Sequence, residues 1–482
     1  MLVALIIGIF FVVASISVYR TLLLRRPQKK LINSRETNFA IDNDAVTKLQ
    51  KALKLETISD QEGLHDYTTF LHFHALLEEK FPLVHRILSR EKFGKYSLLY
   101  KWPGSNGALK PMMLMSHFDV VPATKPSAWR YPPFGGVAAD GYIWGRGALD
   151  VKGGIVAIMA ALERLITEGW RPRRTIYIAL GHDEESGGSK GNALIARALR
   201  DRGIRLHYVL DEGGLIINDF SKDIASPVAL VGIAEKGYLT LALSVLGGGG
   251  HASAPPKNTA TGILARALTR IEKKKFPLTL GAPIMALLAG LAPHLPFGKR
   301  LVIANAWLFA PVFKAFMARS DFMGAMLRTT VAPTMLQGSV KENVLPTQAR
   351  ALINVRVING EQVASTITTI KAIINDERVL VERVGFAAEP STISRTTSEG
   401  FLDLSTAIAT VFPNAIIAPY PVFATTDSRY YEAISDDTYR FLPFAVDKSD
   451  LQGIHGIDER ISQESLSLGV EFFVQLLKNG RA

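Results

Sequence analysis

The feature that most constrains the fold is an acidic motif at the end of a short apolar run. Residues 174–180 are rich in β-branched and aromatic side chains, and Gly181 ends the run, which is typical of a buried parallel strand. The next residues, 182–186, read His-Asp-Glu-Glu-Ser. Ligands and catalytic groups collect at this end of strands in open α/β sheets, and a divalent cation would explain why adjacent carboxylates are tolerated. The alternative is an acidic surface turn.

Two other expected strands end in the same way. Residues 111–115 run into Ser116-His117-Phe118-Asp119, and residues 206–210 run into Asp211-Glu212-Gly213-Gly214. Helices expected over 155–169 and 188–201 would connect the three strands, so the strands are predicted to be parallel. The potential ligands would then lie at one edge of a single sheet.

Two glycine-flanked residues add to this set. Asp150 lies between Gly147 and Gly153, where glycines allow the tight bends that bring a carboxylate to a loop tip. His455 lies between Gly453 and Gly456. The chain contains no cysteine, so any metal must be held by histidines and carboxylates, and thiol catalysis is excluded.

The amino terminus predicts a membrane segment. Residues 2–19 are an uncharged apolar run of 18 residues, about 27 Å long as a helix, which is close to the thickness of a bilayer core. The run lacks a basic region before it and a clear cleavage site after it, so a single-pass anchor is favoured over a cleaved signal. Basic residues from Arg20 onward would hold the globular part in the cytosol by the positive-inside rule.

The length of 482 residues suits two domains of unequal size. Residues 1–42 are predicted to form the anchor and a linker. Residues 43–235 and 357–482 are predicted to form an α/β catalytic domain with a central, mostly parallel sheet, and residues 236–356 an inserted α+β domain. Residues 276–336 are unusually apolar and interrupted by prolines. We expect short packed core helices there, with an acyl-binding surface as the alternative.

Several function classes find no support. The net charge of +11 is dispersed, and no zinc-finger, KH or RNP-like pattern accompanies it, so no nucleic-acid partner is expected. Solvated surface or attraction to anionic lipid explains the charge better. The glycines at 247–250 precede Pro255 and Pro256, which argues against a dinucleotide site, and no G-x-S-x-G elbow of a serine hydrolase occurs.

The order of the motifs, H-x-D, G-x-x-D-x-K-G, D-E-E-S-G, D-E-G-G and a distant H-G, resembles the M20 metallopeptidases. Residues 250–256 (GHASAPP), 305–309 (NAWLF) and 426–429 (TDSR) are similar to the carboxypeptidase S and N-acyl-amino-acid hydrolase branch. The resemblance covers nearly everything after residue 42. It implies a zinc-peptidase-type catalytic domain with an inserted lid or dimerisation domain.

The resemblance also implies a site with two zinc ions per subunit, with cobalt or manganese left open. Asp150 would bridge the ions, and the cis peptide bond of the family would follow it, before Val151. Glu184 would be the general base and Asp119 an acid that orients an imidazole. One ion would be held by Glu185 and His455, and the other by His117 and Asp211. Glu212 precedes the same double glycine, so the choice between Asp211 and Glu212 stays open.

Four further positions would bind substrate by the same resemblance. Asn343, Arg356 and Arg429 match substrate clamps, and the planar fork of arginine suits a free α-carboxylate. His251 matches a lid histidine that supports the oxyanion in a partner's active site, which implies a homodimer.

The predicted function is hydrolysis of the amide bond before a C-terminal amino acid with a free carboxylate, in a dipeptide or an N-acyl amino acid. The family analogy places the enzyme on the periplasmic or lumenal side of the membrane, against the positive-inside rule. The alternative function is a catalytically silent, membrane-anchored binding or scaffold protein on the same fold.

Overall fold

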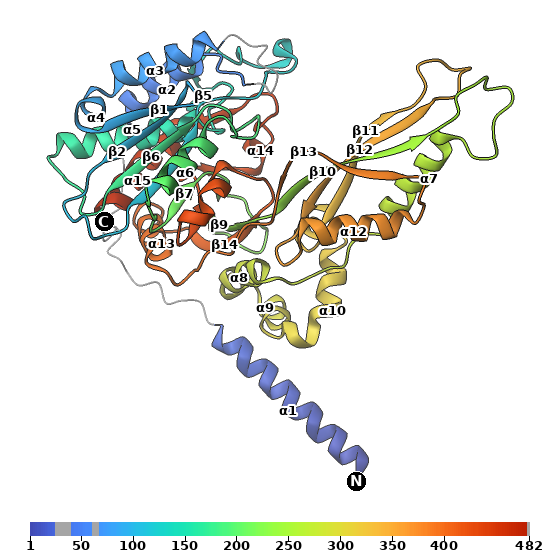
Figure 1. Ribbon diagram of the computed structural model, residues 1–482. Coiled ribbons are helices and arrows are strands. Elements are labelled where there is room, and N and C mark those ends of the chain that lie inside the picture. The colour runs from blue at the N-terminus through green and yellow to red at the C-terminus, as the bar shows by residue number, and fades with distance from the viewer. Residues whose placement is uncertain (25–39, 60–66, 480–482) are drawn as a thin grey trace.

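Two β-sheets set side by side organise the molecule (Figure 1). The computed structural model describes residues 1–24, 40–59 and 67–479. Most of residues 20–42, the predicted linker, lie outside these ranges.

Within the described residues, the large sheet has ten strands in the order β1-β2-β6-β3-β7-β15-β9-β8-β16, with β14 paired to β9. Strand β3 pairs in parallel with β6 and β7, as predicted, whereas the β2–β6 and β15–β9 pairs are antiparallel. The sheet is therefore mixed around a parallel centre. The strands are β1 (Ser89–Phe93), β2 (Ser97–Trp102), β3 (Met112–His117), β6 (Ile176–Gly181), β7 (Val209–Asp211), β8 (Ile216–Ile217), β9 (Val228–Glu235), β14 (Ile416–Val422), β15 (Thr438–Arg440) and β16 (Ala445–Val446).

Helices cover both faces of this sheet. Met112 and Leu114 of β3 belong to the buried cluster that includes α5 and α15, whereas Met113 and Met115 belong to the cluster that includes α6. Successive side chains of a strand point to opposite faces, so a strand that is covered on both faces is apolar throughout. The predicted α/β class is confirmed. The helices of this unit are α2 (Asn43–Leu53), α3 (Thr68–Lys80), α4 (Pro82–Ile87), η1 (Pro126–Ala128), α5 (Lys152–Thr167), α6 (Asn192–Asp201), α13 (Glu399–Val411), η3 (Asp427–Ile434), α14 (Lys448–Leu451) and α15 (Gln463–Asn479).

A small antiparallel sheet, β17-β5-β4, lies beside the large one. Its strand β17 follows the loop that carries His455, and its strand β5 precedes the loop that carries Asp150. It thereby brings the two loops together. The strands are β4 (Val137–Ala139), β5 (Tyr142–Trp144) and β17 (Arg460–Ser462).

The second large unit is an antiparallel sheet of order β11-β12-β10-β13, with α7 and α12 packed on it around a core of its own. This unit extends to Ala388, beyond the expected boundary at 356, because Ile370 and Val379 belong to the same core. Its elements are β10 (Gly237–Leu246), α7 (Ala260–Lys273), β11 (Thr330–Gln337), β12 (Gln348–Val357), α12 (Val363–Ile374) and β13 (Leu380–Ala388).

A helical insertion between α7 and β11 comprises α8 (Ala282–Leu291), η2 (Ala292–His294), α9 (Phe297–Ala304), α10 (Ala306–Met317) and α11 (Asp321–Met326). Helix α8 packs on β14, where Leu287 and Leu288 share a buried cluster with Ala418. In contrast, α9 buries no residue and α10 buries only Met317. The expectation of packed core helices is correct for α8, whereas α9 and α10 reach the same buried cluster only at their inner sides, through Ile303, Phe313 and Met317.

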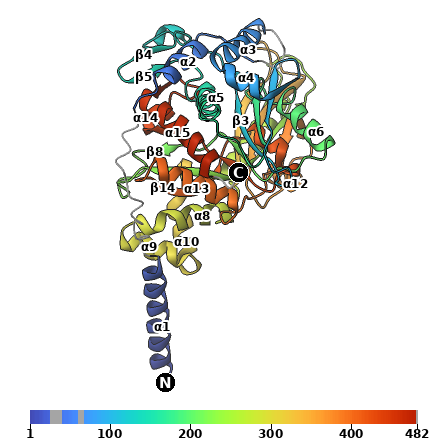
Figure 2. The ribbon, with the colours of Figure 1, turned by 90° about the vertical axis from the view of Figure 1, so that its left-hand side faces the viewer.

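The amino-terminal helix α1 (Leu2–Leu23) has its carboxyl-terminal end beside α9, and its amino-terminal end extends away from the rest of the molecule (Figure 2). Its stretch Leu5–Leu23 is long and apolar enough to cross a membrane, and it is mostly exposed. Helices α9 and α10 are long and apolar enough to cross a membrane only when they are taken together, and they are bent by 113° relative to each other.

Candidate metal centre and substrate pocket

Imidazoles and carboxylates from distant parts of the chain converge at the carboxyl end of β3. His117, the last residue of β3, has its Nε2 3.2 Å from Oδ1 of Asp150. The other carboxylate oxygen of Asp150, Oδ2, lies 3.0 Å from Nε2 of His455, which is also 3.2 Å from Oε1 of Glu185. Asp150 therefore lies between the two imidazoles, and its peptide bond to Val151 is cis.

Glu212, and not Asp211, joins this cluster. Its Oε1 lies 3.1 Å from Nε2 of His117. The Asp211 carboxylate instead accepts hydrogen bonds from the backbone N–H groups of Glu212 and Ser428, at 2.9 and 2.8 Å. Asp211 therefore fixes the local backbone, and of the two acids whose choice the sequence left open, Glu212 is the one that lies beside His117.

Asp119 supports the acidic turn from behind. Its two carboxylate oxygens accept hydrogen bonds from the backbone N–H groups of Glu184 and Glu185, at 3.2 and 3.1 Å, and one of them also accepts from the hydroxyl of Ser59 at 2.6 Å. Nδ1 of His117 lies 3.0 Å from the Asp119 carbonyl oxygen and 3.3 Å from its carboxylate. Asp119 thus orients both the imidazole and the turn that carries Glu184.

Glu459 is a supporting residue that the sequence analysis missed. Its fully buried carboxylate accepts hydrogen bonds from the backbone N–H groups of Gly147, Leu149 and Asp150, at 2.8 to 3.0 Å. It also pairs with Arg146 at 2.6 Å, and the guanidinium of Arg146 donates to the Gly456 carbonyl oxygen at 2.7 Å. This ion pair joins the Asp150 and His455 loops. Its only sequence signal was its position four residues after His455.

The electrostatics are those of a cation site. Burial and the nearby Asp150 carboxylate raise the pKa of Glu212 to about 8, and burial raises the pKa of Glu184 well above its usual value. Asp150 and Glu185, which accept hydrogen bonds from the His455 ring, raise its pKa to about 10. Carboxyl groups that lie close together in a buried site resist full ionisation. A bound divalent cation favours their ionised forms and so lowers their pKa values.

The donor set also fits a metal by geometry. The ligand atoms of His117, Glu184 and Glu212 lie within 4.8 Å of one another, and so do those of His117, Asp150 and Glu185. Imidazole nitrogen and carboxylate oxygen are the ligands that zinc takes when cysteine is absent. The residues present can therefore hold a metal, and the set of His117, Asp150, Glu184, Glu185, Glu212 and His455 is called the metal cluster below.

A pocket of about 490 Å³ opens from this cluster between the two large sheets. Its walls come from the loops that carry Asp150, Glu185, Glu212 and His455, and also from the antiparallel sheet, which contributes Tyr238, Arg356 and Phe386. Arg429 lines the same pocket, so the structure brings both predicted arginine clamps to the metal cluster.

The two arginines differ in their partners. Arg429 donates to the carbonyl oxygens of Thr426 and Gly187, both at 2.8 Å, and lies over the ring of Phe386. Arg356 stacks over Tyr238 and donates from Nε to the side chain of Asn354 at 3.1 Å. Among the described residues no carboxylate lies within ion-pair distance of Arg356, and its Nη1 has no partner. Burial lowers the pKa of Arg356, and no carboxylate of the described chain offsets this effect.

His251 and Asn343 lie apart from the metal cluster. The backbone N–H of Ala252 donates to the Asn343 carbonyl oxygen at 3.0 Å, so the two segments are neighbours. His251 is exposed and contacts Ser253. Neither residue lines the pocket at the cluster.

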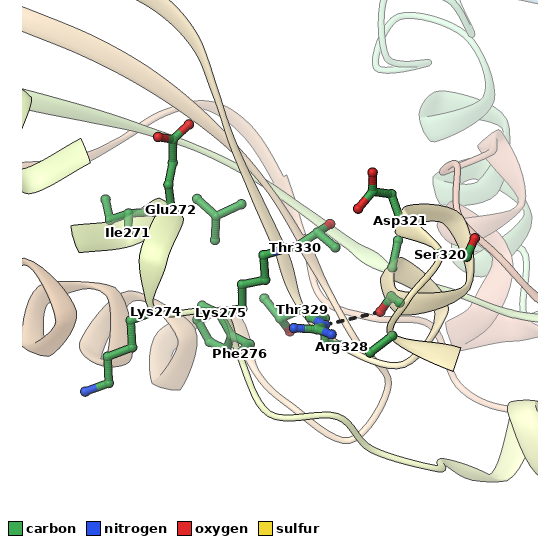
Figure 3. Close-up of a pocket in the computed structure, with 14 residues that line it drawn as sticks. Ile271, Glu272, Lys274, Lys275, Phe276, Ser320, Asp321, Arg328, Thr329 and Thr330 are labelled. Atoms are coloured by element: carbon green, nitrogen blue, oxygen red, sulfur yellow. Dashed lines mark hydrogen bonds between the residues drawn. The ribbon is translucent and has the colours of Figure 1, made fainter. Parts of the chain in front are cut away.

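A second pocket, of about 330 Å³, lies between the end of α7 and α11 (Figure 3). Its lining mixes Lys274, Lys275 and Arg328 with Glu272 and Asp321, and it includes no histidine. Arg328 donates within its own segment, to the Gly324 carbonyl oxygen. The second pocket therefore lacks the imidazole and carboxylate set of the first.

Comparisons with known proteins agree with this site. Residues 113–479 match the model of peptidase family M20/M25/M40. The chain is 37% identical to the probable carboxypeptidase S-like 2 of Dictyostelium discoideum, over 91% of this chain and 85% of that protein. It is also 37% identical to the human N-fatty-acyl-amino acid synthase/hydrolase PM20D1, over 89% of this chain and 86% of that protein.

The fold has solved counterparts. The M20 family metallo-carboxypeptidase Sso-CP2 of Sulfolobus solfataricus superposes with a TM-score of 0.66 at 16% identity, covering 90% of this chain and 98% of that chain. Human carnosine dipeptidase 1 superposes with a TM-score of 0.61, also at 16% identity, covering 90% and 96% of the two chains. With its converged acidic motifs, its fold and these relatives, the chain belongs to peptidase family M20/M25/M40 and is an enzyme that hydrolyses amide bonds.

Proposed function

We propose that this enzyme is a two-zinc hydrolase that releases a C-terminal amino acid with a free carboxylate from a dipeptide or an N-acyl amino acid. The names of its relatives, carboxypeptidase S-like and N-fatty-acyl-amino acid synthase/hydrolase, support these two substrate classes. The observation that carries the proposal is the cationic Arg356 without a carboxylate partner, in the pocket that also contains the metal cluster.

The proposed metal ligands form two sets, one on each side of Asp150. One ion would be held by Glu185 and His455 and the other by His117 and Glu212, with Asp150 between them, because its two carboxylate oxygens face the two imidazoles separately. When bound, the zinc ions supply Lewis acidity and lower the pKa of water at the site. Cobalt or manganese would be held by the same ligands.

Glu184 acts as the general base. It is placed beside the ligand Glu185 by the backbone contacts to Asp119. Its carboxylate accepts the proton of the attacking water and delivers it to the departing amine nitrogen. The raised pKa of Glu184 suits a group that must hold this proton between the two steps.

Arg356 binds the free carboxylate of the substrate. A guanidinium that is largely removed from water and has no anionic partner gains most from binding one, since its desolvation has already occurred. Arg429 is already engaged by two carbonyl oxygens, so it shapes the pocket wall and adds positive charge.

Membrane anchorage by α1 and homodimer formation complete the proposal. The apolar stretch Leu5–Leu23 supports anchorage. The exposed position of His251, away from the metal cluster of its own subunit, leaves this side chain available to a partner's site. Asn343 lies beside it and would act with it.

The test is amino-acid release by the full chain from matched pairs of N-acyl amino acids and their carboxamides, with and without chelator. We expect release that is lost with chelator and confined to the free carboxylates. Arg356→Ala should raise KM for the carboxylates with a small change in kcat, and Arg356→Lys should recover part of the loss. Equal cleavage of carboxamides by the wild-type enzyme would contradict the carboxylate clamp.

A second variant tests the base. Glu184→Gln should keep the metal content of the wild type and lower kcat by about 10²- to 10⁴-fold, the range for loss of a general base. A Glu184→Gln enzyme with near wild-type turnover would refute this role. A metal-loaded, folded wild-type chain that releases nothing from any substrate would favour the silent binding protein.

A further inference from the structure

We propose that α9 and α10 form a re-entrant hairpin that enters one leaflet of a phospholipid bilayer beside α1, with anionic lipid headgroups around its base. This inference rests on the membrane anchorage by α1 proposed above. It adds a second membrane contact, made by the globular body itself.

The first observation is an exposed apolar face on α10. Leu308, Val312 and Phe316 are four residues apart, so they lie on one side of the helix, with side chains 42%, 70% and 63% exposed. Trp307 adjoins them at 55%. Contiguous exposed apolar side chains of this size mark an interaction surface, and tryptophan favours the boundary between lipid and water.

The second observation fixes the depth of the hairpin relative to α1. Asn305, at the bend between α9 and α10, is fully buried and donates from Nδ2 to the Ser17 carbonyl oxygen at 3.0 Å. Ser17 lies inside the apolar stretch, six residues before its end at Leu23, which is about 9 Å along the helix. If α1 spans a bilayer, the bend lies within the same leaflet.

The shape of the hairpin suits entry into one leaflet. Helix α10 has 12 residues, about 18 Å of helix, and is too short to cross a hydrocarbon core of about 30 Å. The bend of 113° between α9 and α10 returns the chain to the side from which it came. Asn305 also donates to the Leu301 carbonyl oxygen at 2.9 Å, and such internal pairing is what backbone groups in lipid require.

The basic residues in and around the hairpin indicate that its lipid partners have anionic headgroups. Residues 273–320 contain seven Lys and Arg and no Asp or Glu, although Lys299 pairs with Asp223 from outside this stretch at 2.5 Å. Arg300 lies 3.5 Å from the Leu24 carbonyl oxygen, at the end of α1 nearest the body, and Lys314 and Arg319 follow in and after α10. Basic side chains that flank an apolar surface attract anionic headgroups.

A bilayer explains this face better than a protein partner does. Helices α1 and α10 lie at the same end of the molecule in both views (Figure 1, Figure 2), and both carry exposed apolar side chains. A second copy of the chain that covered α10 would therefore have to share this space with the membrane around α1.

Trp307 is a natural probe for the test. The full chain has five tryptophans, of which Trp102, Trp129 and Trp144 are buried in the large domain. The full chain would be reconstituted in vesicles of phosphatidylcholine and phosphatidylglycerol with brominated acyl chains, which quench tryptophan on contact. We expect quenching in the wild type that is lost in Trp307→Phe. The same quenching in both proteins would overturn the proposal.

Two matched variants separate the apolar face from general effects. Val312→Glu with Phe316→Glu should reduce the quenching of Trp307. Leu336→Glu, at another exposed apolar side chain on β11, should not. All variants should hydrolyse a soluble dipeptide as the wild type does. Stronger quenching when phosphatidylglycerol carries the bromine would support the headgroup preference, and equal quenching by both lipids would overturn it.

Extraction with alkaline carbonate reports on α1 separately. Retention of the chain in the membrane with unquenched Trp307 would overturn the hairpin and leave the anchor intact. Release of the chain together with quenching of Trp307 in the untreated vesicles would support the hairpin and overturn the anchor. Unquenched Trp307 in a dimer cross-linked through α10 would assign this face to a second copy.

Discussion

At the scale of single residues, neighbouring acids in this site have opposite tasks. Asp211 and Glu212 follow one another at the end of β7, and consecutive side chains at a strand end point to different sides. Glu212 faces His117, whereas Asp211 accepts backbone hydrogen bonds. The sequence alone could not choose between them, because both are acids and both precede Gly213-Gly214.

This difference gives a paired prediction. Glu212→Gln should bind about one metal ion fewer per subunit and lose most activity, because a neutral amide replaces an anionic ligand. Asp211→Asn should keep its metal and lose about 1–3 kcal/mol of stability, because its amide N–H₂ group faces a backbone donor. Metal analysis by mass spectrometry and denaturant unfolding would measure both. Loss of metal in Asp211→Asn alone would reverse our assignment.

At the scale of elements, the Asp150 and His455 loops depend on one buried ion pair. The Glu459 carboxylate accepts hydrogen bonds from three backbone N–H groups and from the Arg146 guanidinium. Removing one partner of a buried pair leaves the other charge without compensation, at a cost of about 3–5 kcal/mol. Both loops carry proposed ligands, so a residue that binds no substrate should control metal affinity.

We therefore expect Glu459→Gln to lower metal affinity by about 10- to 100-fold, the range for groups that orient ligands, and to lower the midpoint of denaturant unfolding. Activity should return in part when excess zinc is added. Glu464→Gln, which changes an exposed acid on the adjacent helix α15, is the control and should behave as the wild type. Unchanged zinc affinity in Glu459→Gln would show that the loops are held by other contacts.

The elements that the sequence predicted correctly are those in which local pattern and burial agree. The apolar runs that became β3 and β6 are buried on both faces, so composition alone indicated a parallel centre. The boundary at 356 came from a change in composition, but β13 is largely exposed along its length and gives no core pattern. Its place in the second sheet follows from its pairing with β10 and from the packing of Val381 and Ala387 against the core.

Helices α9 and α10 show a different limit. Apolar composition is the same for a helix buried in protein and for one that faces lipid, so the sequence could not separate the two. In the structure α8 packs on β14, whereas α10 is largely exposed.

At the scale of the whole molecule, the acidic site makes stability depend on metal and pH. Glu212 has a pKa of about 8 in the fold and an ordinary value of 4.5, so the metal-free folded state holds a proton that the unfolded chain releases. This stabilisation is complete below pH 4.5 and is lost as the pH rises through about 8. His455 acts in the same direction at higher pH, since its pKa of about 10 exceeds its ordinary 6.5.

The chelated protein should therefore melt at progressively lower temperature from pH 5 to pH 8. The zinc-loaded protein should lose less over the same range, because the cation favours the ionised carboxylates. Thermal melting followed by circular dichroism, with and without chelator, would measure this. A chelated protein whose melting temperature rises steadily with pH would contradict the charge balance described here.

The position of α8 has a consequence for how cooperatively the molecule unfolds. In the chain, α8 belongs to the insertion between α7 and β11 of the second sheet, yet its buried side chains pack with β14 of the first. Neither sheet can unravel fully without exposing this shared apolar cluster to water. Two units with separate cores should therefore give a single heat-capacity peak in calorimetry, and weakening the cluster, as in Leu288→Ser, should split that peak into two.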